Sequence, residues 1–273
     1  MKEERFAFGK NWHSFVQASL NEERIAVSGR YMLDFLGVED LDGKSFLDIG
    51  SGSGIHSLAA LRAGAREVLS FDYDADSVAA TQAVKATKAP VDDRWRIERG
   101  SVLDEEYLDG LGRYDIVYSW GVLHHTGNQW LAIRNASERV APGGIFYIAL
   151  YSADMHVDPP PEFWLDVKRR YIASGQLKRN WMVLWYLWRF SLHGNPLRIP
   201  RLWRTMKEYR KSRGMSYLTD VRDWIGGWPM EFSHDRDVVE LFQKELGFDL
   251  LKMKQGEANT EYLFRRRDPV PSA

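Results

Sequence analysis

The sequence predicts a doubly wound α/β fold with a mostly parallel, seven-stranded sheet, and three observations predict it. Short apolar runs alternate with helical patterns between residues 45 and 151. A glycine-rich turn, GSGSG at 50–54, follows the first of these runs. The last two runs, FDLLKMK and NTEYLF, are too close together for a crossover connection. Strands that alternate with helices favour parallel pairing, whereas the last two runs predict a terminal antiparallel hairpin.

The predicted elements begin with a helix over 21–37. Asn21 is placed to cap its first turn and Gly37 to end it. Five strands are expected next, at SFLDIG, VLSFDYD, RWRIERGSV, YDIVYSW and IFYIALY. Helical patterns follow the first, second and fourth of them, at IHSLAALRAGA, SVAATQAVKATKA and LAIRNASERVAPGG. A further helix over 235–246 precedes the hairpin.

Composition predicts how the chain is organised around this core. We expect a Rossmann-like core over 41–152 and 233–267, an N-terminal helical lid over 1–40, a cap inserted at 153–232 and a disordered tail over 268–273. The inserted cap is rich in Pro, Trp, Arg and Tyr, and we expect it to be helical. Between Lys168 and Arg213 lie thirteen Lys or Arg residues against one acid, Glu208. The formal net charge of −1 therefore hides a strongly basic segment within an acidic remainder.

The 273 residues, 44% of them hydrophobic, are enough to bury a full core. The chain has no cysteine, which excludes disulfides and thiolate metal sites. The start, MKEERFAFGK, lacks the apolar stretch of a signal peptide, and the aromatic run WMVLWYLW is far shorter than the roughly 20 residues that cross a bilayer. We expect a cytoplasmic location, no transmembrane segment and no metal site, and we leave peripheral membrane contact open.

The glycine turn is expected to hold a nucleotide-like ligand. Gly50, Gly52 and Gly54 are spaced one residue more tightly than the glycines of a nicotinamide-binding turn. Asp48 precedes them, and its carboxylate would repel a pyrophosphate but attract a ligand with an ammonium and a sulfonium, as S-adenosylmethionine has. Asp72 ends the second strand, where a carboxylate can accept both hydroxyls of a ribose.

These motifs together resemble the class I S-adenosylmethionine-dependent methyltransferases. The resemblance rests on LDIGSGSG, on Asp72 in SFDYD, on Asp104 in GSVLDEEY and on YDIVYSWGVLHHTGN. It is greatest for the small-molecule methyltransferase type whose fourth strand ends in a V-L-H-H motif. APGG before the fifth strand and the terminal hairpin agree with it. The resemblance covers about 40 to 151 and 233 to 267, and thus neither the cap nor the first forty residues.

The resemblance implies S-adenosylmethionine as the cofactor and gives the turn its roles. Gly50, Gly52 and Gly54 would let the backbone approach the methionyl and ribose parts, because glycine has no Cβ. Asp48 would orient the methionyl ammonium, directly or through water. Asp72 would hold the ribose hydroxyls.

Three further residues would complete the cofactor site. The resemblance implies that Tyr73 lines the adenine, that Asp104 accepts from its amino group and that Trp120 flanks the cofactor. An acid at a strand end is also a common helix N-cap, and for Asp104 this alternative stays open.

Two histidines are candidates for catalysis. Methyl transfer is an in-line displacement at an activated carbon, so the protein aligns the nucleophile and, where required, removes its proton. His124 and His125 follow the fourth strand, at the edge of the sheet where ligands bind. Either could be the general base. The alternative is that one of them only hydrogen-bonds the loop backbone.

The cap is expected to bind the methyl acceptor, because it follows the fifth strand and would lie over the open end of the sheet. Trp224 and Trp228 would form walls of the acceptor pocket. Trp12 could belong to a lid or to an apolar plug, and Glu261 could reach the pocket or be solvated. The cap tryptophans could also simply form a small core of their own.

The sequence thus predicts a methyltransferase that acts on an oxygen or nitrogen atom of a small-molecule acceptor or of a lipid- or saccharide-linked one. An anionic acceptor would suit the basic cap. An RNA methyltransferase that docks through the cap is a second hypothesis, ranked lower because no separate RNA-binding module is recognisable. A catalytically silent protein that binds the cofactor and recruits a partner is a third.

Overall fold

The computed structural model describes residues 6, 9, 21–213, 217–256 and 258–268, with only the backbone described over 209–213. The expected lid residue Trp12 and residues 269–273 of the expected tail lie outside this part. The described strands are β1 (Ser45–Ile49), β2 (Glu67–Asp72), β3 (Trp95–Arg99), β4 (Tyr114–Trp120), β5 (Val140–Tyr151), β6 (Phe248–Gln255) and β7 (Asn259–Arg266).

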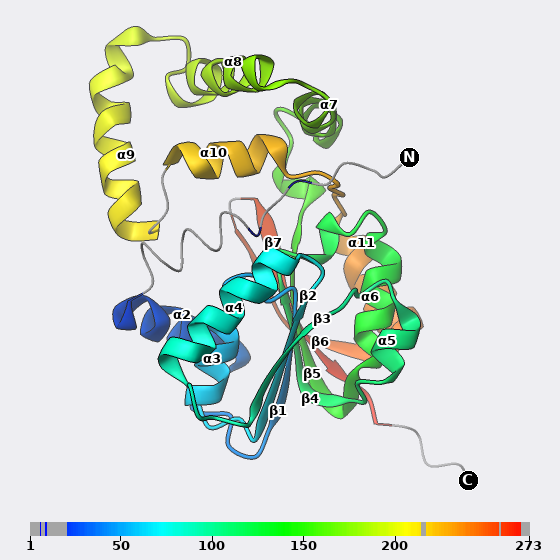
Figure 1. Ribbon diagram of the computed structural model, residues 1–273. Coiled ribbons are helices and arrows are strands. Elements are labelled where there is room, and N and C mark those ends of the chain that lie inside the picture. The colour runs from blue at the N-terminus through cyan, green and yellow to red at the C-terminus, as the bar shows by residue number, and fades with distance from the viewer. Residues whose placement is uncertain (1–5, 7–8, 10–20, 214–216, 257, 269–273) are drawn as a thin grey trace.

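The described helices cover both faces of the sheet and extend beyond one end of it (Figure 1). They are α2 (Glu22–Leu36), α3 (Ile55–Arg62), α4 (Ala75–Lys88), α5 (Glu105–Asp109), α6 (Gln129–Glu138), α7 (Pro161–Ile172), α8 (Gln176–Tyr186), α9 (Ile199–Arg213), α10 (Tyr217–Gly226) and α11 (Asp235–Glu240). Short 3-10 turns occur at Leu123–His125, Ala153–Met155 and Pro196–Arg198, and π-helical turns extend α8 over Leu187–Ser191 and α11 over Leu241–Leu246.

The sheet has the order β3-β2-β1-β4-β5-β7-β6 among the described residues. β1 to β5 pair in parallel, and β7 pairs antiparallel with both β5 and β6. This order confirms the predicted fold class, including the terminal hairpin. It places the carboxyl ends of β1, β2 and β4 side by side, which is where the predicted cofactor residues lie.

Several local predictions can be compared with the structure directly. Asn21 caps α2 by accepting from the backbone N–H of Arg24, and Gly37 ends that helix with φ 74°. The helix before β5 ends earlier than expected, at Glu138, and the APGG run belongs to β5. Pro142 explains the difference, because the residues before a proline avoid helical backbone.

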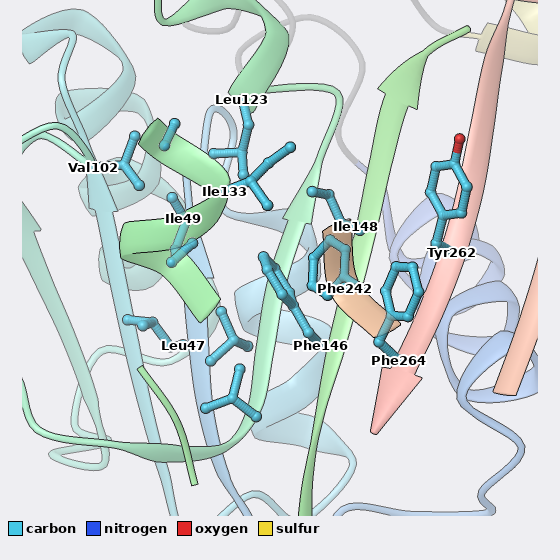
Figure 2. Packing of buried hydrophobic residues seen from close by; sticks show 14 of the residues in the cluster. Leu47, Ile49, Val102, Leu123, Ile133, Phe146, Ile148, Phe242, Tyr262 and Phe264 are labelled. Carbon is cyan, nitrogen blue, oxygen red and sulfur yellow. The ribbon is translucent and has the colours of Figure 1, made fainter. Parts of the chain in front are cut away.

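The core consists of two apolar layers, one on each face of the sheet. Alternate residues of one strand supply opposite layers, as Phe46 and Leu47 do. One layer packs under α2, α3 and α4, and the other packs under α6 and α11 (Figure 1). Figure 2 shows the second layer, where the ring centroids of Phe242 and Phe264 are 3.9 Å apart. This packing fixes the strands whose ends carry the site.

Helices α7 to α10 form a cap beyond the end of the sheet from which β5 leads into α7 (Figure 1). Helices α7, α8 and α10 share an apolar cluster that includes Trp164, Val221 and Ile225. Part of the cap aromatics therefore form a local core, whereas Trp181 and Trp203 are 73% and 68% exposed. None of the described helices combines the length and hydropathy that crossing a bilayer requires.

Candidate functional site

A cavity of about 1340 Å³ lies between the strand ends and the cap. Its floor is the glycine turn and the ends of β2 and β4. Its other walls come from the loop after β4, from β5 and from the cap helices α7 and α10. One continuous space therefore touches most of the predicted cofactor residues and two of the predicted acceptor residues, Trp224 and Trp228.

The glycine turn is shaped by positions that only glycine fits. Gly50 has φ 78°, and a Cβ there would lie 2.3 Å from Val122 Cγ1. Gly54 has φ 73°, begins α3 and would place a Cβ 2.7 Å from Thr81 Cγ2. Gly50 and Gly52 line the cavity, whereas Gly54 does not. Gly54 thus lets the helix start close to α4 rather than facing the cavity.

Asp72 lies at the end of β2 with both carboxylate oxygens held by the backbone. Oδ2 accepts from the N–H of Gly52 at 3.1 Å, and Oδ1 accepts from the N–H of Asp74 at 2.9 Å. Burial raises the pKa of Asp72 to about 6 despite these bonds. The carboxylate is thus oriented into the cavity from a fixed strand end, where a ribose could be bound.

Asp48 lies deeper, at 2% exposed, on the neighbouring strand β1. It accepts a hydrogen bond from the hydroxyl of Ser57, which in turn accepts from Ser70 at 2.6 Å. Burial raises the pKa of Asp48 to about 7, and the charge of Asp72 adds to this shift. Within the described part of the chain, neither carboxyl group forms an ion pair with a lysine or arginine.

These two carboxyl groups fit the implied cofactor. Buried carboxylates without a cationic partner are costly, and a cationic ligand removes that cost. Asp48 and Asp72 both line the cavity. S-adenosylmethionine has an ammonium group that Asp48 could bind and a pair of ribose hydroxyls that Asp72 could bind.

Tyr73 and Trp120 flank the same part of the cavity and are 56% and 42% exposed. Asp104 is placed differently from the implied adenine contact. Its carboxylate caps α5 by accepting from the N–H of Tyr107 at 3.1 Å, and it is not among the residues that line the cavity. The structure therefore shows the N-cap that the sequence left open for Asp104.

Glu261 is neither solvated nor on the cavity wall. It is 6% exposed within β7 and accepts hydrogen bonds from Tyr31, Tyr147 and Trp120. The bond from Trp120 Nε1 measures 3.2 Å. Of β7, Asn259 lines the cavity and Glu261 does not. Glu261 instead positions the indole of Trp120 by accepting the hydrogen bond from its Nε1–H.

His124 and His125 both line the cavity, in the 3-10 turn after β4. His124 Nδ1 accepts from the backbone N–H of Tyr151 at 3.3 Å. His125 Nδ1 lies 2.8 Å from the carbonyl oxygen of Pro229, which can only accept, so Nδ1 carries the proton. Burial lowers the pKa of both rings, to about 4 for His125 and well below the ordinary range for His124.

The two neutral rings therefore carry their protons on different nitrogens. Nε2 of His124 must hold the proton, because its Nδ1 is an acceptor. Nε2 of His125 must hold a lone pair, because its Nδ1 is a donor. The Nε2 of His124 is buried with no hydrogen-bond partner in the described part of the chain. His124 can therefore donate a hydrogen bond through Nε2–H, whereas Nε2 of His125 can accept a hydrogen bond or take up a proton.

The cap half of the cavity is lined by aromatic side chains, by the acids Asp158, Asp220 and Asp223, and by a buried lysine. Trp224 and Trp228 are among the lining residues, and Trp224 packs edge to face against Tyr151 with ring centroids 5.5 Å apart. Lys168 of α7, which sequence reasoning missed, also lines it and is 1% exposed. Its Nζ donates to the carbonyl of Trp224 and lies 4.3 Å from the centroid of that ring.

Lys168 left a detectable signal in the sequence. Trp164, Val167, Lys168 and Tyr171 recur at the spacing of one helix face, and the three apolar ones are buried. A lysine on an otherwise apolar helix face is unusual, and this could have identified Lys168 as a candidate site residue. Burial lowers the pKa of Lys168 to about 7.

A family model described as a methyltransferase domain matches residues 21–209. The chain belongs to the S-adenosylmethionine-dependent methyltransferases. S-adenosylmethionine is the cofactor of this family, in agreement with the glycine turn and its two carboxyl groups. The match begins before β1 and extends through most of the cap.

Curated methyltransferases are similar to part of the chain. The ubiquinone biosynthesis O-methyltransferase of Methylobacterium sp. (strain 4-46) is 31% identical over 144 residues, which are 52% of this chain and 55% of that protein. The protein of the same name from Rhizobium rhizogenes is 28% identical over 135 residues, 50% of this chain and 52% of the other. The chain thus spans about half the length of the curated relatives it matches.

Solved structures share the fold. A putative S-adenosylmethionine-dependent methyltransferase from Methanococcus maripaludis has a TM-score of 0.53 at 16% identity and covers 100% of both chains. Magnesium protoporphyrin IX methyltransferase from Synechocystis PCC 6803, with bound S-adenosylhomocysteine, has a TM-score of 0.51 at 13% identity, covering 97% of this chain and 90% of that one. At such identities the likeness concerns the fold alone.

Proposed function

We propose that this methyltransferase moves a methyl group from S-adenosylmethionine to an oxygen or nitrogen atom of a small, anionic acceptor. The observation that carries the proposal is the single cavity shared by Asp48 and Asp72 at one end and by His125 and Lys168 at the other. Cofactor and acceptor would then meet beside the turn that holds the two histidines.

In the proposed reaction the protein aligns the acceptor and receives its proton. When bound, S-adenosylmethionine would supply a methyl carbon activated by its positive sulfonium, from which the acceptor oxygen or nitrogen would displace the sulfur. Nε2 of His125 takes the acceptor's proton, since its Nδ1–H is fixed by Pro229. His124, whose Nε2 carries a proton, would donate a hydrogen bond to the acceptor.

Lys168 supports an acidic group on the acceptor. Its ammonium has three N–H donors, and the carbonyl of Trp224 is the acceptor found for it among the described residues. The nearest contacts lead back to the histidines: Lys168 packs on Trp224, Trp224 on Tyr151, and Tyr151 on His124. The charge of Asp223, which also lines the cavity, raises the pKa of Lys168 against the effect of burial and favours the ammonium form. An ammonium among aromatic side chains suits a carboxylate or phosphate on an apolar body.

We further propose that 153–232 acts as the acceptor-binding cap and that the N-terminal segment 1–40 contributes a lid. Phe6 lines the cavity and donates its N–H to the carbonyl of Trp228 at 2.9 Å. Gly9 donates its N–H to Asp74, next to the cofactor end. One described residue of the segment, Phe6, thus contacts the cap half, and another, Gly9, contacts the cofactor half. A cytoplasmic location stays a prediction.

Transfer of label tests the proposal. S-adenosylmethionine with a labelled methyl group is incubated with the protein and with separated lysate fractions: molecules of low mass, lipid extract, RNA and protein. We expect label in the low-mass or lipid fraction. Label in RNA that ribonuclease releases would favour the RNA hypothesis instead. No label in any fraction, with S-adenosylhomocysteine still bound, would favour the silent cofactor-binding protein.

A further inference from the structure

The outer face of α8 exposes a stripe of large apolar side chains. Leu177, Trp181, Leu184 and Trp188 are 85%, 73%, 61% and 48% exposed. Leu177, Trp181 and Leu184 are spaced by four and three residues, which places them within a sector of about 60° at 100° per residue. Trp188 continues the series in the π-helical turn that extends α8. We call these four residues the α8 stripe.

The α8 stripe is not needed to pack the cap. The opposite side of the helix serves that purpose, with Val183 at 5% exposed in the cap cluster. A surface helix normally turns polar residues outward. Here both faces are apolar, and α8 lies at the outer edge of the cap, away from the sheet (Figure 1). Contiguous exposed apolar surface of this kind usually marks an interaction site.

Cations flank the α8 stripe. Lys178 and Arg189 each follow a stripe residue by one position and so lie on the same side of it, about 100° around the helix. The segment after α8 continues the pattern, with Leu197 85% exposed and next to Arg198.

These features favour one class of binding partner. Leucine and tryptophan side chains beside lysine and arginine match the layered chemistry of a bilayer surface, where apolar groups enter the acyl boundary and cations meet anionic headgroups. RNA would gain nothing from exposed leucines. A second copy would bring one basic face against another. We infer that the α8 stripe docks the protein on an anionic lipid bilayer.

Vesicle sedimentation tests this inference independently of methyl transfer. The full chain is mixed with vesicles of phosphatidylcholine alone or of phosphatidylcholine with phosphatidylglycerol. Trp181→Ala removes the most exposed tryptophan of the stripe. Trp130→Ala, on α6, is the matched control, because Trp130 is 37% exposed on a different face. Binding of S-adenosylhomocysteine by each variant verifies that it is folded.

We expect the wild type to bind the anionic vesicles more tightly than the neutral ones, with affinity that falls as salt rises. Trp181→Ala should weaken binding about tenfold, as loss of one large buried side chain predicts. Trp130→Ala should bind like the wild type. Equal binding by the two variants, or no binding of the wild type to anionic vesicles, overturns the inference. A dimer in sedimentation velocity that Trp181→Ala dissociates also overturns it, and assigns the stripe to a second copy.

Discussion

His124 and His125 are neighbours with ring centroids 4.4 Å apart, yet their Nδ1 atoms form hydrogen bonds of opposite direction. Nδ1 of His124 accepts from a backbone N–H, and Nδ1 of His125 donates to a carbonyl. Two residues that are identical in the sequence are thus chemically different in the fold. The proposed mechanism therefore assigns proton removal from an acceptor to His125.

Replacing His125 with Ala should lower kcat by about 10²- to 10⁴-fold, the usual contribution of a positioned general base. Because the pKa of His125 is lowered to about 4, its ring is neutral at ordinary assay pH, and wild-type kcat should decline only below about pH 5. Steady-state rates across pH measure both effects. An unchanged kcat in His125→Ala would leave alignment of the reactants as the whole mechanism.

His124→Ala should act mainly on stability. It removes the acceptor for the N–H of Tyr151, and leaving that buried donor unpaired costs about 1–3 kcal/mol. Urea unfolding of both histidine variants measures this. A kcat loss in His124→Ala as large as that in His125→Ala, with stability unchanged, would show that the two roles are assigned the wrong way round.

Asp72→Ala should weaken binding of S-adenosylhomocysteine about 10- to 100-fold, because hydrogen bonds to a charged group contribute about 1.5–3 kcal/mol. Asp76→Asn is a matched control, since Asp76 is an exposed acid at the start of α4 and does not line the cavity. Titration calorimetry measures both. Equal affinities for the two variants would remove Asp72 from the cofactor site.

Binding should also depend on pH. Burial raises the pKa of Asp48 to about 7 and that of Asp72 to about 6, so protons compete with a cationic ligand as pH falls through this range. The ligand-free protein binds more protons than the unfolded chain between about pH 4 and 7, and these groups therefore lower its stability as pH rises. We expect S-adenosylhomocysteine to raise the melting temperature more at about pH 8 than at about pH 5.5. An increment that does not vary with pH would contradict this.

Lys168→Met should abolish the preference of the cap half of the cavity for acidic over uncharged ligands. With S-adenosylhomocysteine bound, benzoate or phenyl phosphate should raise the melting temperature of the wild type, whereas uncharged methyl benzoate should not. Lys178→Met is the control, because Lys178 is exposed on α8 and does not line the cavity. A Lys168→Met protein that is less stable but still prefers the acids would show that Lys168 only satisfies the carbonyl of Trp224.

Glu261→Ala should destabilise the fold and loosen the cofactor wall together. The change leaves the donors of Tyr31, Tyr147 and Trp120 without their shared acceptor. The Tyr147 hydroxyl is the buried one of the three, and leaving a buried donor unpaired costs about 1–3 kcal/mol. Trp120→Phe removes one of these bonds and separates the two effects. Urea unfolding and S-adenosylhomocysteine affinity measure them. If both remain at wild-type values in Glu261→Ala, the network has no supporting role.

The sequence predicted the sheet because strong local signals coincide there with the tertiary arrangement. Asn21 and Gly37 bound α2 as expected, and the glycine turn follows β1 as expected. The role of Asp104 could not be predicted in this way, because an acid at a strand end fits the same sequence pattern whether it caps a helix or faces a ligand. Only the position of Tyr107 resolves it.

The acceptor half depends on contacts between residues far apart in the chain. Lys168 meets Trp224 across 56 positions, and His125 meets Pro229 across 104. No local pattern indicates such pairs or the tautomers that they impose. The same applies to Glu261, whose three donors come from α2, β4 and β5. Local patterns therefore predict the cofactor half better than the acceptor half.

The charge of the methylated product tests the central claim most directly. Label transferred by the wild type from S-adenosylmethionine is followed by anion exchange of the product from the low-mass or lipid fraction. The proposal of an anionic acceptor predicts a labelled product that still carries an acidic group and whose formation falls in Lys168→Met but not in Lys44→Met, since Lys44 is exposed before β1 and lies neither in the cavity lining nor on α8. A neutral labelled product, or label that is released only by ribonuclease, would contradict it.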